Sequence, residues 1–163
     1  MARYNKARLS FMMFLQFFIW GAWYATGGNY MKTHGMTSVI YLAYMASAIG
    51  SIVSPFFLGA IADRFFSVQK VLGVMHILSG VFVFCAPFFA EGPSVSPTLF
   101  LVFLLLHMLC YMPTVSLATA TAFHLLSNKE KEFPTIRVFG TLGWITAGIV
   151  ISYFLQADAT ALP

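Results

Sequence analysis

Three side chains in the last quarter of the sequence have the types and the spacing needed to bind a flat, polar molecule. Arg137, Thr141 and Trp144 are separated by four and three residues, so a helix would place them on one face. A guanidinium can donate two parallel hydrogen bonds, and an indole can stack on a planar group. The alternative is that Arg137 extends to a membrane surface, where arginine is common. The spacing alone leaves both interpretations open.

Gln16, Trp20 and Trp23 repeat this spacing near the N-terminus. A glutamine inside an apolar segment favours a hydrogen-bonding partner or a water-filled cavity over lipid. Gln16 and Trp20 are therefore candidates for the wall of a binding site. The two tryptophans could instead belong to an aromatic belt at a membrane surface, and for Trp23 that interpretation is the better one.

The sequence offers no recognisable arrangement for catalysis. Paired acids, a His-Glu-x-x-His pattern and a Ser/His/Asp grouping are all missing from it, and nothing suggests a metal site or a cofactor. We therefore expect no enzyme. The histidines His76, His107 and His124 are interpreted as neutral groups hydrogen-bonded by their neighbours. All acidic residues lie outside the apolar runs, so the chain supplies no buried carboxylate for a proton relay: Asp63, Glu91, Glu130, Glu132 and Asp158.

The elements that must position these residues are long apolar runs. Charged residues make up 9% of the chain and hydrophobic ones 60%, with a mean hydropathy of +0.83, whereas soluble domains carry about 25% charged residues. A helix needs about 20 apolar residues to cross a bilayer, and lipid requires every backbone group to be paired within the chain. The sequence therefore predicts an all-α membrane protein with five transmembrane helices, at residues 9–30, 39–61, 71–90, 99–123 and 136–155.

The positive charges predict the orientation of these helices. With a cytoplasmic N-terminus, all but one of the nine lysines and arginines fall on the inner side, as the positive-inside rule requires. The exception is Lys32. The net charge of +4 is explained by this topology and does not indicate nucleic-acid binding. The inner residues are Arg3, Lys6, Arg8, Arg64, Lys70, Lys129, Lys131 and Arg137.

The segment before the fifth run carries three local predictions. The alternating lysines and glutamates of residues 129–132 predict a solvated loop. Pro134 is expected to open the following helix, where its missing N–H costs nothing. Gly140, Gly143 and Gly148 indicate either close helix packing or a hinge.

One short turn between the second and third runs resembles a known gating motif. Gly59, Asp63, Arg64 and Lys70 resemble the loop between helices 2 and 3 of the major facilitator superfamily. The predicted place of the turn, on the inner side, agrees with that loop. The resemblance implies that Asp63 and Arg64 form part of a cytoplasmic gate, with Asp63 meeting a helix N-terminus where a carboxylate is favoured.

Within that superfamily the chain resembles the nucleoside:proton symporters. Residues 14–23, 111–114 and 133–143 carry this likeness, and with the turn they span nearly the whole chain. The resemblance implies about twelve helices in two halves, with substrate bound between them near the midplane. It also implies that the face of Arg137 and Thr141 looks into the central cavity. Residues 1–163 would then form an N-terminal half that lacks its sixth helix and the C-terminal half.

We therefore expect a fragment of a proton-coupled nucleoside transporter that works by alternating access, in a bacterial inner membrane. Arg137 and Thr141 would hydrogen-bond the substrate, and Trp144 would stack on the base or close the cavity. Gln16 and Trp20 would line the wall. The expected partners are a nucleoside, protons, the lipid bilayer and the missing half, with no nucleic acid. The alternatives are a transporter of another small polar substrate such as a sugar, and a structural or regulatory membrane fragment that transports nothing.

Overall fold

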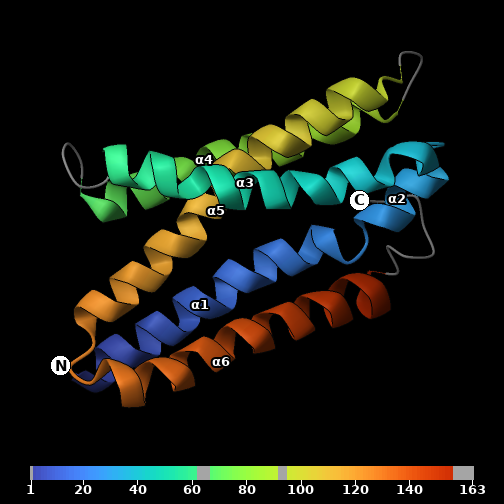
Figure 1. The fold of residues 1–163 in the computed structure, drawn as a ribbon. Helices are drawn as coiled ribbons and strands as arrows, with labels where there is room; N and C mark the ends of the chain where they lie inside the picture. The colour runs from blue at the N-terminus through green and yellow to red at the C-terminus, as the bar shows by residue number, and fades with distance from the viewer. Residues whose placement is uncertain (1, 62–66, 92–94, 156–163) are drawn as a thin grey trace. The chain divides into compact units, whose positions relative to one another are not determined.

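The computed structural model describes residues 2–61, 67–91 and 95–155, which form helices and short connections without a strand (Figure 1). Two shorter 3-10 segments, η1 and η2, and a π-helical end, η3, accompany the α-helices. In chain order the elements are α1 (Ala2–Tyr24), α2 (Gly27–Thr33), η1 (Thr37–Val39), α3 (Ile40–Ile61), α4 (Val68–Cys85), η2 (Ala86–Phe89), α5 (Pro97–Leu125), α6 (Lys129–Gly148) and η3 (Ile149–Phe154).

The predicted all-α membrane fold is confirmed. Five helical segments among the described residues are long and apolar enough to cross a bilayer. Their order matches the five runs seen in the sequence, and eight of the ten ends differ by three residues or fewer. The segments are Lys6–Thr33, Thr37–Phe56, Val68–Phe89, Pro97–Leu125 and Lys129–Phe154.

The described chain divides into two compact units, each of which is considered separately. The first unit joins Met1–Tyr30 to Ala118–Pro163, and the second is Met31–Leu117. In the first unit α1 and α6 pack side by side (Figure 1). The predicted first run of residues 9–30 is interrupted here, because a turn at residues 25–26 separates α1 from α2. The following pair, Gly27 and Gly28, favours such a break because glycine stabilises helices poorly.

Glycines allow the backbones of α1 and α6 to approach closely. A Cβ atom added at Gly143 would collide with the carbonyl oxygen of Phe14. One added at Gly21 would lie 3.2 Å from the Cβ of Ala147. Small residues at such contacts are typical of membrane helices. Of the two interpretations of Gly143, the structure therefore supports close packing.

The start of α6 corrects two predictions. The segment Lys129 to Glu132 is the first turn of α6, not a loop. The side chain of Asn128 accepts a hydrogen bond of 3.2 Å from the Lys131 N–H, so the helix begins one residue after Asn128. Pro134 consequently lies inside α6, where it removes a backbone hydrogen bond instead of opening the helix.

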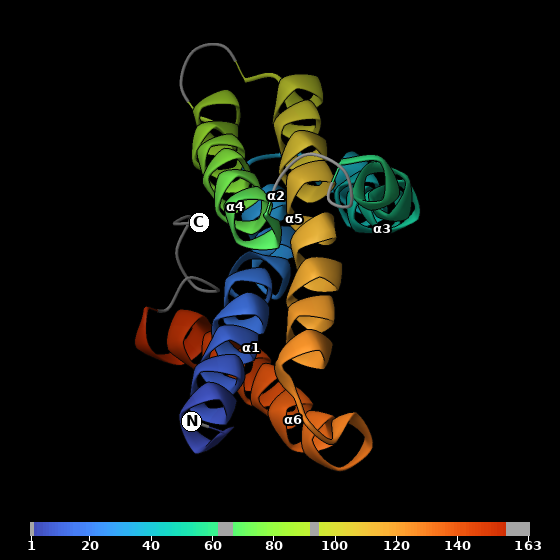
Figure 2. The same ribbon diagram turned by 90° about the vertical axis from the view of Figure 1, so that its left-hand side faces the viewer.

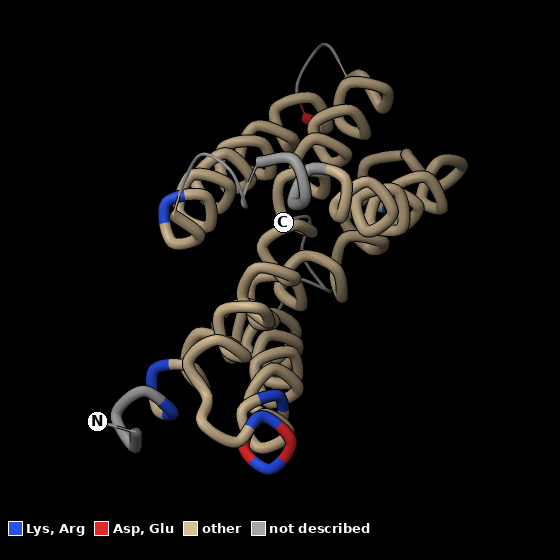
Figure 3. Tube along the Cα trace, turned by 60° about the vertical axis from the view of Figure 1, so that its left-hand side comes forward, with Lys and Arg blue, Asp and Glu red and all other residues tan. Residues whose placement is uncertain are grey.

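Opposite charges gather where α1 and α6 begin in the first unit (Figure 3). The Nζ atom of Lys6 lies 2.7 Å from a carboxylate oxygen of Glu132, so the two helices are joined there by an ion pair. Glutamates in a first helical turn also interact favourably with the positive end of the helix dipole. These two effects explain why a highly charged segment forms a helix.

The second unit contains α3, α4 and most of α5, and Figure 2 shows α4 beside α5. The rings of Phe82 and Phe103 lie 6.2 Å apart at this contact. Gly50 on α3 faces α5, because a Cβ there would lie 2.8 Å from the carbonyl oxygen of Met108. Gly50 thus allows the backbones of α3 and α5 to approach closely, as small residues do between membrane helices.

Candidate substrate-binding site

Aromatic side chains of α1 and α6 meet in the first unit. The rings of Trp20 and Trp144 lie 5.3 Å apart and nearly perpendicular, at 87°. Tyr24 contacts both, with ring separations of 5.8 Å to Trp20 and 5.6 Å to Trp144. All three separations lie in the range of favourable aromatic pairs, and the two pairs made by Trp20 are edge-to-face. Trp20 and Trp144, two predicted site residues that are far apart in the sequence, are therefore brought together.

Arg137 lies against a phenylalanine that the sequence did not single out. Its Cζ atom is 4.1 Å from the centre of the Phe17 ring, within the range of a cation–π interaction. Arg137 is exposed, whereas Phe17 is only 8% exposed. The Phe17 ring in turn lies 6.0 Å from that of Trp20. A continuous series of contacts therefore runs from the guanidinium of Arg137 through Phe17 and Trp20 to Trp144.

The other predicted binding residues have different exposures. Thr141 is exposed, one turn beyond Arg137 on α6. Gln16 is 2% exposed, so its polar group lies inside the protein. Trp23 is half-buried, with its ring 5.4 Å from that of Tyr24. The part that these three side chains take in binding stays a prediction.

The gating motif is only partly visible. Gly59 lies near the end of α3, and Lys70 is exposed in the first turn of α4. Asp63 and Arg64 lie outside the described residues. The gating role stays a prediction for all four.

The arrangement in the first unit suits a planar ligand with hydrogen-bond acceptors. An exposed guanidinium presents five N–H donors in a fixed fork, and the Thr141 hydroxyl can both donate and accept. Trp144 and Trp20 offer aromatic faces and edges beside them. Sequence reasoning missed Phe17 and Tyr24. Tyr24 carried a signal, because it lies four residues beyond Trp20 on the same helix face, whereas Phe17 carried none.

A buried polar cluster joins α4 and α5 in the second unit. The Nδ1 atom of His107 lies 2.8 Å from the hydroxyl and 2.9 Å from the carbonyl oxygen of Ser79. Its ring stacks on Tyr111 at 5.6 Å. His76 contacts the carbonyl oxygen of Leu72 at 3.1 Å. The prediction that neighbours hydrogen-bond His107 and His76 is confirmed.

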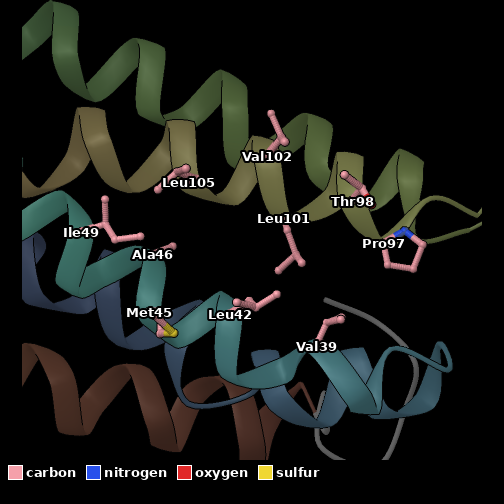
Figure 4. A pocket seen from close by; sticks show the side chains of 10 residues that line it. All are labelled: Val39, Leu42, Met45, Ala46, Ile49, Pro97, Thr98, Leu101, Val102 and Leu105. Carbon is pink, nitrogen blue, oxygen red and sulfur yellow. The ribbon is translucent and has the colours of Figure 1, made fainter.

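A groove of about 350 Å³ lies between α3 and α5 in the second unit (Figure 4). Its lining is almost entirely apolar and includes none of the predicted binding residues. The groove is lined by Val39, Leu42, Met45, Ala46, Ile49, Pro97, Thr98, Leu101, Val102 and Leu105.

In the described part of the chain no group of three or more His, Cys, Asp or Glu side chains could hold a metal ion.

Comparison with known proteins points to one family. The sequence model described as nucleoside H+ symporter matches residues 4–162. YegT of Escherichia coli K12 is 39% identical over 93% of this chain, and the xanthosine permease of the same organism is 32% identical over 89%. The nucleoside permease NupG of Escherichia coli K12 is 31% identical over 90%. In each case the chain spans 35% of the relative's length.

The fold has a solved counterpart. A crystal structure of the nucleoside transporter NupG, in a mutant form, superposes on 96% of this chain with a TM-score of 0.84 and 27% identity. The matched part is 39% of that structure. The similarity therefore extends over nearly all of the helices described above.

Proposed function

The chain belongs to the nucleoside H+ symporter family, and from this membership we propose that it forms part of a proton-coupled nucleoside transporter working by alternating access. The curated relatives are transporters and permeases by name, not enzymes. Since the chain spans 35% of their length, we further propose that it supplies the N-terminal half of the transporter. The remaining helices would complete the substrate site and contribute the acids that carry protons.

The structural observation that carries this proposal is the contact of Trp20 with Trp144, which Phe17 connects to Arg137. A nucleoside combines a flat aromatic base with carbonyl oxygens and ribose hydroxyls. Stacking on an aromatic side chain contributes about 1–3 kcal/mol per base. An arginine fork suits the acceptors at the edge of such a base. The site therefore combines the two kinds of contact that a nucleoside needs.

Each predicted residue has a specific role in the proposal. Arg137 and Thr141 hydrogen-bond the nucleoside, and Trp144 stacks on its base. Trp20 and Gln16 line the wall of the cavity. The edge-to-face contact of Trp20 holds the Trp144 ring in a fixed orientation, which reduces the entropy lost on binding.

The membrane topology completes the proposal. The five spans place the protein in a membrane, which we propose to be the bacterial inner membrane. The N-terminus would be cytoplasmic, because this orientation places nearly all lysines and arginines on the inner side. The turn with Asp63 would then lie at the cytoplasmic end, where a gate is needed.

Uptake of radiolabelled uridine by proteoliposomes tests this function. We expect the full-length protein to accumulate uridine when the proton concentration is higher outside, because the two fluxes are coupled. A protonophore should abolish the accumulation, and unlabelled glucose should not compete. The isolated 163-residue chain should give no uptake, since the other half of the cavity is missing.

Two outcomes would contradict the proposal. Accumulation of glucose without accumulation of uridine would favour a sugar transporter of the same fold. Absence of transport by the full-length protein, at normal yield and melting temperature, would favour a structural or regulatory membrane protein.

A further inference from the structure

Arg137 has a long, exposed side chain that must adopt one conformation to bind a ligand through its fork. Such a side chain has up to about 2 kcal/mol of rotamer entropy to lose. A free guanidinium on the outer surface of a helix would also be drawn toward a membrane surface. Something must therefore hold it near the aromatic cluster, formed by Trp20, Tyr24 and Trp144, before the ligand arrives.

Phe17 provides a fixed surface for the guanidinium. Its ring belongs to α1, whereas Arg137 belongs to α6, and the two helices are packed together. With 8% of its surface exposed, the ring has little freedom to move away. The Cζ atom of Arg137 lies 4.1 Å from the ring centre, and an aromatic face attracts a cation at this distance.

Gly140 provides the space for this conformation. It follows Arg137 by three residues, so it lies on the same side of α6. A Cβ atom at this position would lie 2.7 Å from the Nη1 atom of Arg137 and 2.7 Å from the Cδ2 atom of Phe17. Any other residue would therefore push the guanidinium off the ring or move the ring itself.

We propose that Phe17 and Gly140 are positioning residues that hold the guanidinium of Arg137 in the conformation that binds nucleoside. This inference rests on the proposed function, because it requires Arg137 to contact the ligand. Phe17 supplies the attractive surface and Gly140 leaves it accessible. Neither residue touches the nucleoside, so both affect affinity only through Arg137.

A double-mutant cycle on uridine binding tests the inference in the full-length protein. Phe17→Leu should lower the affinity roughly two- to fivefold, because a cation–π contact with an exposed cation contributes about 0.5–1 kcal/mol. Arg137→Gln should lower it more. In the double variant, Phe17→Leu should cause no further loss, because the guanidinium it positions is gone. Phe17→Tyr keeps the ring and should restore most of the affinity.

The control is Phe18→Leu, which removes a half-buried ring that stacks on Phe14 in the same helix. This variant should bind uridine normally. If Phe17→Leu does not fold, Phe17→Met replaces it under the same criteria, since methionine fills more of the volume and also lacks an aromatic face.

The possible outcomes separate the two proposals. If Phe17→Leu lowers affinity equally with and without Arg137, its effect is structural and the positioning role is wrong, while the site itself stands. If Arg137→Gln binds uridine as the native protein does, the proposed site is wrong and the positioning role falls with it. If Phe17→Leu lowers the uridine affinity of the native protein but not that of the Arg137→Gln variant, the result supports both the proposed site and the positioning role.

Discussion

Replacing Arg137 with alanine is expected to lower the affinity for uridine at least about 100-fold, because hydrogen bonds to a charged group contribute about 1.5–3 kcal/mol each and a fork makes two. Each 1.4 kcal/mol corresponds to about a factor of ten in the dissociation constant. The helix should be unaffected, since the side chain is exposed and alanine favours helices. Isothermal titration of the purified full-length protein with uridine measures the change.

Two variants control this experiment. Lys131→Ala removes an exposed positive charge from the first turn of the same helix, away from the aromatic cluster, and should bind uridine normally. Arg137→Lys keeps the charge and loses the planar fork, so its affinity should fall between those of the native and alanine forms. Equal affinities of Arg137→Ala and Lys131→Ala would show that the guanidinium does not contact the substrate.

Substitution of Gly143 by leucine is expected to have the largest effect on folding. A side chain at this position meets the backbone of Phe14, which cannot rotate away as a flexible side chain can. Overpacking a well-packed contact costs about 1–3 kcal/mol, and more when backbone must move. Because α1 and α6 carry the aromatic cluster on their shared contact, the variant should lose both thermal stability and uridine binding. The melting temperature in detergent measures the first effect.

Gly148→Leu is the matched control, because it makes the same change at the end of the same helix. A Cβ atom at Gly148 meets no neighbouring atom within 4 Å. Its melting temperature should stay close to the native value, as surface substitutions usually change stability by less than about 0.5 kcal/mol. Similar melting temperatures for both leucine variants would contradict the close packing of α1 on α6.

The five spans were predictable because lipid imposes a strong constraint on the sequence. A continuous apolar run of sufficient length has few alternatives to a helix in a bilayer. The beginning of α6 was not predictable in the same way. The charges of Lys129 to Glu132 suggested a loop, whereas the Asn128 cap and the ion pair with Lys6 stabilise a helix there. That ion pair joins residues far apart in the sequence, so no local pattern reveals it.

The candidate site was predictable only where polar or tryptophan side chains stood out. Arg137, Thr141 and Trp144 are conspicuous in an apolar helix, and their spacing places them on one face. Phe17 is one of 18 phenylalanines, so its residue type carries no signal. Its importance comes from the packing of α1 on α6, which brings its ring under the guanidinium. Contacts between helices are set by tertiary structure and cannot be read from helical periodicity.

The central claim is that the facing sides of α1 and α6 form part of the nucleoside site. Photolabelling of the full-length protein with 5-azidouridine, followed by mass spectrometry of its peptides, tests this most directly. We expect label that unlabelled uridine displaces in the peptides containing Trp20 and Trp144. Displaceable label on the groove between α3 and α5, with none on α1 or α6, would contradict the claim.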